Sequence, residues 1–108
     1  MKRSHLSTFE LMVLLALTRL GDDAYGVTIA REIEESSGKD VALGSVYAAL
    51  ERLQIKGLAS SAIGEPTPER GGRAKRYFRL TAKGAREVRD AQRTLTRLWG
   101  ATLRKGTA

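Results

Sequence analysis

The stretch GGRAKRYFRLTAKG, residues 71–84, sets basic side chains around two aromatic residues and between glycines. A solvated loop tolerates such charges but has no need of aromatic residues among them. The stretch alternates with a period near two, which is typical of a half-buried strand. One face would carry Lys75, Tyr77 and Arg79, and the other Arg76, Phe78 and Leu80. We therefore expect a basic strand that packs on a core supplied by the rest of the chain.

The residues before this stretch predict its partner strand. Residues 58–63, LASSAI, are weakly apolar, and five of the next nine residues, GEPTPERGG, are Gly or Pro. Two strands joined by such a segment, LASSAI and RAKRYFRL, predict a β-hairpin with a long, irregular tip. Because the tip carries Glu65 and Glu69, contacts with an anionic partner are expected at the base of the hairpin instead.

Three segments before the hairpin have the apolar spacing of helices. We expect these helices over residues 7–21, 24–38 and 44–57, with short connections that force them into one cluster. Ser7 and Glu10 form a capping box for the first helix, and Asp22 or Asp23 is placed to cap the second. Thr81 is placed to cap a fourth helix, which we expect to run to about residue 103.

This order of elements predicts a mainly α fold with a small β-hairpin. We expect a winged helix-turn-helix domain over residues 1–81, followed by a C-terminal dimerisation helix and tail over residues 82–108. In that architecture the third helix enters the major groove of double-stranded DNA, and the hairpin, or wing, lies along the backbone. Cations on the wing would contact phosphates and release counterions.

The distribution of charge fits such a partner. The chain of 108 residues has a net charge of +7, and residues 71–108 hold eleven basic and two acidic residues. So uneven a distribution indicates a polyanionic partner, nucleic acid before anionic membrane. A solvated helix face is the alternative explanation of the charge alone.

Composition excludes several other classes. The absence of cysteine excludes disulfides and thiolate metal sites, and the single histidine, His5, leaves little for metal binding or histidine-based catalysis. We find no nucleophile–base pair or phosphate-binding loop, so we expect no enzymatic activity, metal or cofactor. The longest apolar run, residues 11–17, is far shorter than the roughly 20 residues of a membrane span. We expect a soluble, cytoplasmic protein without a membrane partner.

Two segments, GSVYAALERLQIKGLASS and GGRAKRYFRLTAKG, resemble the PadR family of transcriptional regulators. The family pattern is matched by Tyr47, Leu50, Leu53, Gly57, Tyr77, Phe78, Leu80, Thr81 and Gly84. LLALTRLGDDAYGVTIAREIEE also resembles the first two helices of the family, including its Tyr25–Gly26 step. Roughly residues 7–100 are covered, and the single helix after the wing is similar to the short subfamily. The resemblance implies a homodimer, in most members a repressor, that releases operator DNA on binding a small molecule or under stress.

We expect the DNA-binding residues on the third helix and the base of the wing: Ser45, Tyr47, Ala48, Arg52, Arg73, Lys75 and Arg76. Only Arg52 on the third helix is a strong donor to guanine, which predicts modest or partly indirect sequence specificity. Other roles stay open for three of them. Tyr47 could lie at the edge of the core, Ser45 could cap its helix, and Arg52 could pair with Glu51 or Asp40.

The first and last helices predict a dimer. The first helix is apolar on nearly every side, and a domain of this size can cover only one of them. We expect the last helix of one chain to pack on the first helix of its two-fold mate, with a small apolar or aromatic inducer at the seam. The expected interface residues are Leu11, Leu15, Val88, Leu95, Leu98 and Trp99. Such a dimer suits a palindromic operator. The alternative function is a winged-helix module for protein–protein contact without specific DNA binding.

Overall fold

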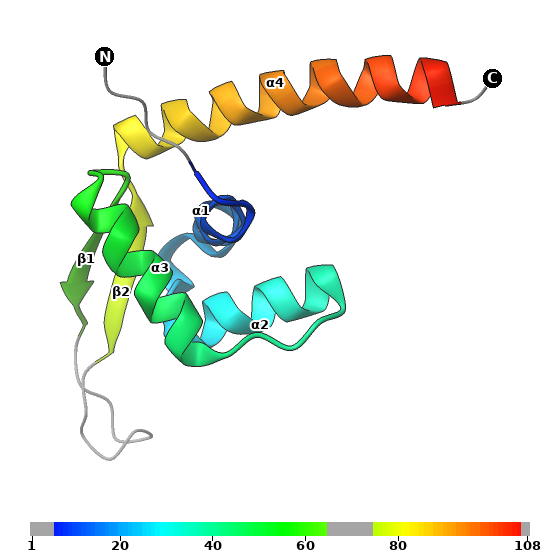
Figure 1. The fold of residues 1–108 in the computed structure, drawn as a ribbon. Helices are drawn as coiled ribbons and strands as arrows, with labels where there is room; N and C mark the ends of the chain where they lie inside the picture. The colour runs from blue at the N-terminus through cyan, green and yellow to red at the C-terminus, as the bar shows by residue number, and fades with distance from the viewer. Residues whose placement is uncertain (1–5, 65–74, 107–108) are drawn as a thin grey trace.

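The structure, a computed structural model, describes residues 6–64 and 75–106. Within these ranges it contains four α-helices, one short 3-10 helix and a two-stranded antiparallel sheet (Figure 1). The elements are α1 (Thr8–Leu20), η1 (Gly21–Asp23), α2 (Gly26–Ser37), α3 (Leu43–Ile55), β1 (Ala59–Ile63), β2 (Arg76–Leu80) and α4 (Ala82–Gly106). Three helices, a hairpin and a last helix are the predicted winged helix-turn-helix order.

The core forms where α1, α2 and α3 meet the base of the hairpin. Its largest fully buried side chains are Val13, Leu14, Ile29, Val46, Leu50, Leu53 and Leu58. Burying one such side chain contributes about 1.5–3 kcal/mol, so this cluster is the main source of stability. The hairpin adds Phe78, the buried residue of β2, which fastens the wing to the helices.

The capping box predicted for α1 is confirmed. The Ser7 N–H donates to Glu10 Oε1 at 3.1 Å, and the Glu10 N–H donates to Ser7 Oγ at 3.0 Å. The exchange satisfies two amide groups that the first turn of a helix leaves without intrahelical partners. Glu10 is nevertheless only 3% exposed, so its carboxylate needs further partners inside the protein.

The prediction that Asp22 or Asp23 caps α2 is wrong. Both residues lie in η1, and the N-cap of α2 is Tyr25. The Tyr25 N–H donates to Thr28 Oγ1 at 3.0 Å, so a threonine inside the first turn performs the reciprocal part of the cap. The physical reason is that Tyr25 is extended, with φ −136° and ψ 174°, which places the preceding aspartates too early in the chain to cap.

Tyr25 is extended because it joins the sheet. The two main strands pair from Ala59 opposite Leu80 to Ile63 opposite Arg76. On the other edge of β2, Tyr25 forms an isolated antiparallel bridge with Tyr77. The chain between α1 and α2 therefore acts as a one-residue third strand, which the sequence did not predict.

A tight junction joins the end of α3 to the start of α4. The prediction that Thr81 caps α4 is confirmed, since its Oγ1 accepts from the Gly84 N–H at 2.9 Å. The same hydroxyl donates to the Gly57 carbonyl at 2.7 Å. A Cβ on Gly84 would lie 2.1 Å from the Leu58 carbonyl oxygen. The first turn of α4 can therefore pack this closely on the backbone before β1 only with glycine at position 84.

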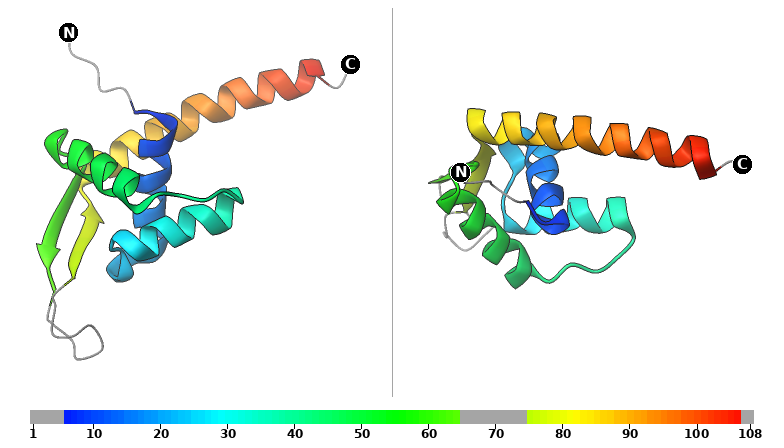
Figure 2. Two further views of the ribbon diagram at one scale, coloured as in Figure 1. Left: turned by 60° about the horizontal axis from the view of Figure 1, so that its bottom comes forward. Right: turned by 45° about the horizontal axis from the view of Figure 1, so that its top comes forward.

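Helix α4 crosses α1 near its own start and then extends beyond the rest of the chain (Figure 1, Figure 2). It ends at Gly106, a little later than expected, and its 25 residues make it roughly 37 Å long at 1.5 Å per residue. None of the helices in the described part of the chain is both long and apolar enough to cross a membrane.

Candidate nucleic-acid interface

Helix α3 buries one face and exposes every residue that the sequence assigned to DNA on it, namely Ser45, Tyr47, Ala48 and Arg52. The helix begins at Leu43 after the N-cap Ala42, which provides no side-chain hydrogen bond. Ser45 therefore lies inside the first turn and does not cap the helix. Its side chain stands at the surface near the N-terminal end of α3.

Tyr47 leans from α3 onto the first residue of α2. A Cβ placed on Gly26 would lie 2.3 Å from the Tyr47 hydroxyl oxygen, so this contact requires glycine at that position. The Tyr47 side chain remains 45% exposed. The hydroxyl end of the ring therefore lies against α2, while nearly half of the side chain stays open to solvent. The Tyr25–Gly26 step of the sequence thus has a packing role that periodicity alone did not indicate.

Arg52 pairs with neither Glu51 nor Asp40, the two partners that the sequence left open for it. Its Nε donates to Glu10 Oε2 at 2.7 Å, and Lys56 Nζ donates to Glu10 Oε1 at 2.9 Å. The reason is geometric, because Arg52 and Lys56 lie one turn apart on the side of α3 that faces the start of α1. The Arg52 side chain is still 50% exposed, so part of its guanidinium faces solvent.

This arrangement controls the ionisation of Glu10. Burial alone would raise its pKa, but the hydrogen bonds from Arg52, Lys56 and the Ser7 backbone outweigh that effect and lower the pKa to about 2. Glu10 is therefore a fixed negative charge at neutral pH. It links the start of α1 to α3 and holds Arg52 and Lys56 at the flank of that helix.

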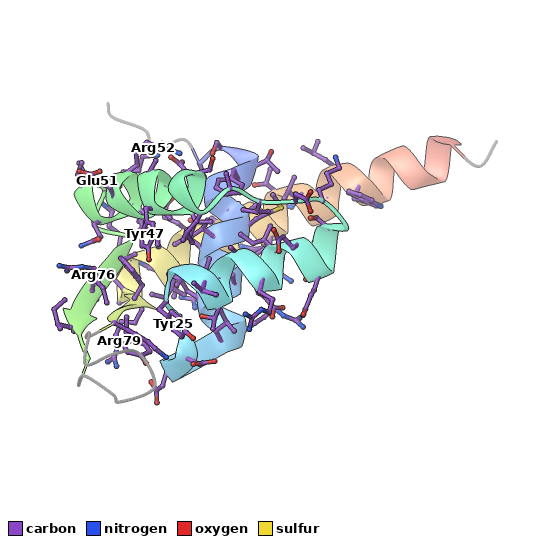
Figure 3. The ribbon with its side chains drawn as sticks, turned by 90° about the horizontal axis from the view of Figure 1, so that it is seen from below. Tyr25, Tyr47, Glu51, Arg52, Arg76 and Arg79 are labelled. Carbon is purple, nitrogen blue, oxygen red and sulfur yellow. The ribbon has the colours of Figure 1, made fainter. Side chains whose placement is uncertain are left out.

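The wing is tied to α3 through Ser61, in the middle of β1. Ser61 Oγ accepts from Gln54 Nε2 of α3 at 3.2 Å and from Arg76 Nη1 of β2 at 3.1 Å. Arg76 lies on the same face of β2 as the buried Phe78, as the alternation predicted. A basic side chain of the wing is thereby positioned next to α3. In Figure 3 it lies between β2 and α3, on the side of α3 opposite Arg52.

The other face of β2 carries a small aromatic cluster. The Tyr25 and Tyr77 rings meet edge to face, with centroids 5.5 Å apart and an interplanar angle of 70°. Lys75 Nζ lies 4.1 Å from the centroid of the Tyr25 ring, a cation–π contact. Arg79 lies 3.9 Å from Asp22, a loose surface pair worth little. Arg73, the remaining basic residue predicted for the wing, lies outside the described residues.

The residues predicted for a dimer seam fall into two groups. Leu15 on α1 and Leu95, Leu98 and Trp99 on α4 are exposed, by 43%, 48%, 61% and 65% respectively. Leu11 and Val88 are half-buried, and Val88 packs against the core of its own chain. Next to Leu15, a groove of about 200 Å³ between α1 and α2 is lined by Met12, Ala16 and Ile33 among others. The single chain does not bring the exposed part of α4 to this groove.

Comparisons with known proteins agree on one family. The sequence profile described as "Transcriptional regulator PadR-like family" matches residues 13–90. The fold is similar to a PadR family transcription regulator from hypervirulent Clostridium difficile R20291, with 21% identity, a TM-score of 0.77 and coverage of 91% of this chain and 97% of that one. The fold is also similar to a PadR-like transcriptional regulator from Bacillus cereus strain ATCC 14579, with 17% identity and a TM-score of 0.78. That match covers 93% of this chain and 92% of the other.

A third solved structure has a higher sequence identity. The protein hsRosR-S4, solved as a complex, is 30% identical with a TM-score of 0.65, covering 85% of this chain and 73% of that one. The comparison with curated protein sequences found no match.

Proposed function

Since the chain belongs to the PadR-like family of transcriptional regulators, we propose that it is a cytoplasmic repressor that binds a palindromic operator as a homodimer. The observation that carries this proposal is the contact between the wing and α3, where Ser61 holds Arg76, at the loop end of β2, beside the exposed face of α3. This arrangement suits a DNA duplex, in which each groove is bordered by phosphates: α3 would enter the groove while Arg76 contacts a phosphate at its edge.

In this proposal the residues divide by role. Ser45 and Ala48, exposed on the N-terminal half of α3, face the major groove. Tyr47, Lys75 and Arg76 contact phosphates on the side of the wing, together with Arg73. Arg52 contacts a phosphate at the opposite side of the groove, because Glu10 holds its Nε and restricts its reach toward the bases.

The homodimer is supported by the apolar side chains that the single chain leaves uncovered. Leu95, Leu98 and Trp99 recur at helical spacing on the part of α4 that extends beyond the core, and Leu15 is exposed beside the groove between α1 and α2. Packing α4 of one chain on α1 of its mate would remove both surfaces from water. Residues 1–81 would then form the DNA-binding unit and residues 82–108 the dimerisation unit.

A small apolar or aromatic inducer, or a stress signal, would release the repressor from DNA. The seam between α4 and α1 of the mate is the place for such a molecule, because Trp99 provides a large aromatic surface there. Leu11 and Leu15 would supply apolar walls from the other chain. Binding at the seam would favour one arrangement of the two subunits over another.

The DNA-binding part is tested by a salt series with duplex DNA from upstream of the gene. Lys75→Ala and Arg76→Ala should weaken binding to all sequences and reduce the slope of log affinity against log salt by roughly one each. Arg89→Ala, which removes the same charge from the exposed surface of α4, is the matched control and should leave the slope unchanged. If the double wing variant keeps the wild-type slope, the wing does not contact phosphates. Binding without salt dependence would favour the protein-interaction module.

The homodimer is tested by analytical ultracentrifugation at micromolar concentration. Leu95→Gln combined with Leu98→Gln should dissociate the dimer, because it introduces two amides into an apolar seam. Arg93→Gln combined with Arg97→Gln, on the other side of α4, is the control and should remain dimeric. A wild-type protein that sediments as a folded monomer under these conditions would refute the proposed assembly.

A further inference from the structure

Helix α3 has an outermost line of four residues opposite its buried face. Gly44, Ala48, Glu51 and Ile55 recur at spacings of four, three and four, which places them on one side of an α-helix. All four are exposed, and Ile55 is 80% exposed. We call these four residues the outer line of α3. A solvated helix face usually carries several charged or long polar side chains, whereas this one holds a single charge.

Gly44 is not explained by the fold. A Cβ added to it would meet no atom within 4 Å, and its φ is not positive, so neither crowding nor backbone conformation requires glycine. Glycine is also a poorer helix former than alanine. The missing side chain therefore makes sense only toward something outside the chain that approaches the helix backbone closely. Ala48, the next residue of the outer line, is also small.

Glu51 has no ion pair or hydrogen bond within residues 6–64 and 75–106, although two cations lie on the same helix. Arg52 and Lys56 are instead engaged by Glu10 at the flank. A carboxylate facing DNA is repelled by phosphates, and a hydrogen bond accepted from a base would offset that repulsion. In the major groove the N4 amino group of cytosine suits it, whereas the N6 amino group of adenine lies beside the N7 acceptor, which repels a carboxylate.

We propose that the outer line of α3 is the element that reads base sequence. Gly44 and Ala48 let the helix backbone approach the bases, Glu51 accepts a hydrogen bond from a cytosine N4 amino group, and Ile55 contacts a thymine methyl group. This inference rests on the proposed DNA binding and names the determinants of its specificity. It replaces the prediction from sequence that Arg52 reads guanine, because Arg52 is held at the flank by Glu10.

Selection of binding sites from a randomised duplex library tests the role of Glu51. The wild-type protein should enrich half-sites with a cytosine at one position, and Glu51→Ala should lose that preference, a loss of roughly 5- to 150-fold in discrimination. Glu51→Gln should shift the preference at the same position toward adenine, which an amide binds through N6 and N7. Glu51→Ala should also bind unselected DNA more tightly, since it removes a negative charge. Glu35→Ala, an exposed carboxylate on α2, controls for that charge.

Gly44→Ala tests whether the backbone of α3 approaches the bases closely. If glycine only served the fold, the variant would change stability and not DNA binding. The variant should be at least as stable to heat as the wild type, yet bind the selected site more weakly. The inference is overturned if Glu51→Ala keeps the cytosine preference or if Gly44→Ala binds the selected site like the wild type. In either case a wild-type protein that still selects a site leaves the proposed function intact. A wild-type protein that enriches no duplex overturns both.

Discussion

The three-helix core buries its apolar side chains, whereas the outer part of α4 exposes them to solvent. In the core, Leu14 and Leu53 are fully buried, and the buried Glu10 carboxylate accepts hydrogen bonds from three donors. On α4, Leu98 and Trp99 are more than half exposed although they recur at the same helical spacing. The apolar side chains of the core are buried within one chain, whereas those on the outer part of α4 are left exposed by it, and the proposed dimer would cover them.

The largest expected effect is the loss of stability when a leucine of the core, rather than one of the outer part of α4, is replaced. Leu53→Ala should lower the free energy of unfolding by about 2–5 kcal/mol at every protein concentration, because it leaves a cavity in the core. Leu98→Ala leaves no cavity within its own chain, so its effect should act through association and shrink on dilution. Urea unfolding at two protein concentrations measures both. Equal losses for the two variants in the monomer would show that α4 packs within its own chain.

A second effect concerns Glu10 and pH. The pKa of Glu10 is lowered from 4.5 to about 2 in the folded protein. Its ionised carboxylate therefore adds to the free energy of unfolding above pH 4.5, and this contribution is lost as the pH falls toward 2. The contribution amounts to about 3 kcal/mol at neutral pH. Glu10→Gln should therefore unfold more easily than the wild type at pH 7, and the difference should shrink between pH 5 and 2.

Urea unfolding across this range measures that difference. Glu35→Gln, an exposed carboxylate on α2, should follow the wild type at each pH and serves as the control. A constant difference between Glu10→Gln and the wild type from pH 7 to pH 2 would contradict the ion cluster.

The smallest expected loss of stability is at Thr81, where the core meets α4. Thr81→Ala should lower the free energy of unfolding by about 1 kcal/mol, since it removes the cap of α4 and the bond to the Gly57 carbonyl. Thr96→Ala, an exposed position on α4, should leave stability unchanged or slightly raised, because alanine is the better helix former. Similar thermal midpoints for the two variants would mean that the junction is weaker than its geometry indicates.

The local features of the fold were predictable from sequence because they depend on near neighbours. Alternation around Phe78 predicted the wing, and the Ser7–Glu10 and Thr81 caps follow from residues three positions apart. Helical spacing also predicted which residues of α3 are exposed, since one buried face defines the other.

Contacts between distant residues were not predictable in the same way. Glu10 meets Arg52 and Lys56 across 42 and 46 positions, and no pattern within one segment encodes that meeting. For the same reason, neither Glu51 nor Asp40, which the sequence left open as partners of Arg52, pairs with it. Tyr25 leaves its expected helix because β2 offers an edge to pair with, a consequence of tertiary packing. That nothing within the chain requires glycine at position 44 emerges only once the space around it is known.

The junction at Thr81 also determines how motion can pass through the molecule. Its hydroxyl donates to the Gly57 carbonyl, just beyond α3, and accepts from the first turn of α4, and Lys83 Nζ donates to the Lys56 carbonyl at 3.1 Å. These bonds couple the start of α4 to the end of α3, so a rigid α4 would act as a lever roughly 37 Å long. A tilt of about 5° at the junction displaces the far end by about 3 Å over that length. In the proposed dimer, the angle at which the two α4 helices cross would set the distance between the two recognition helices.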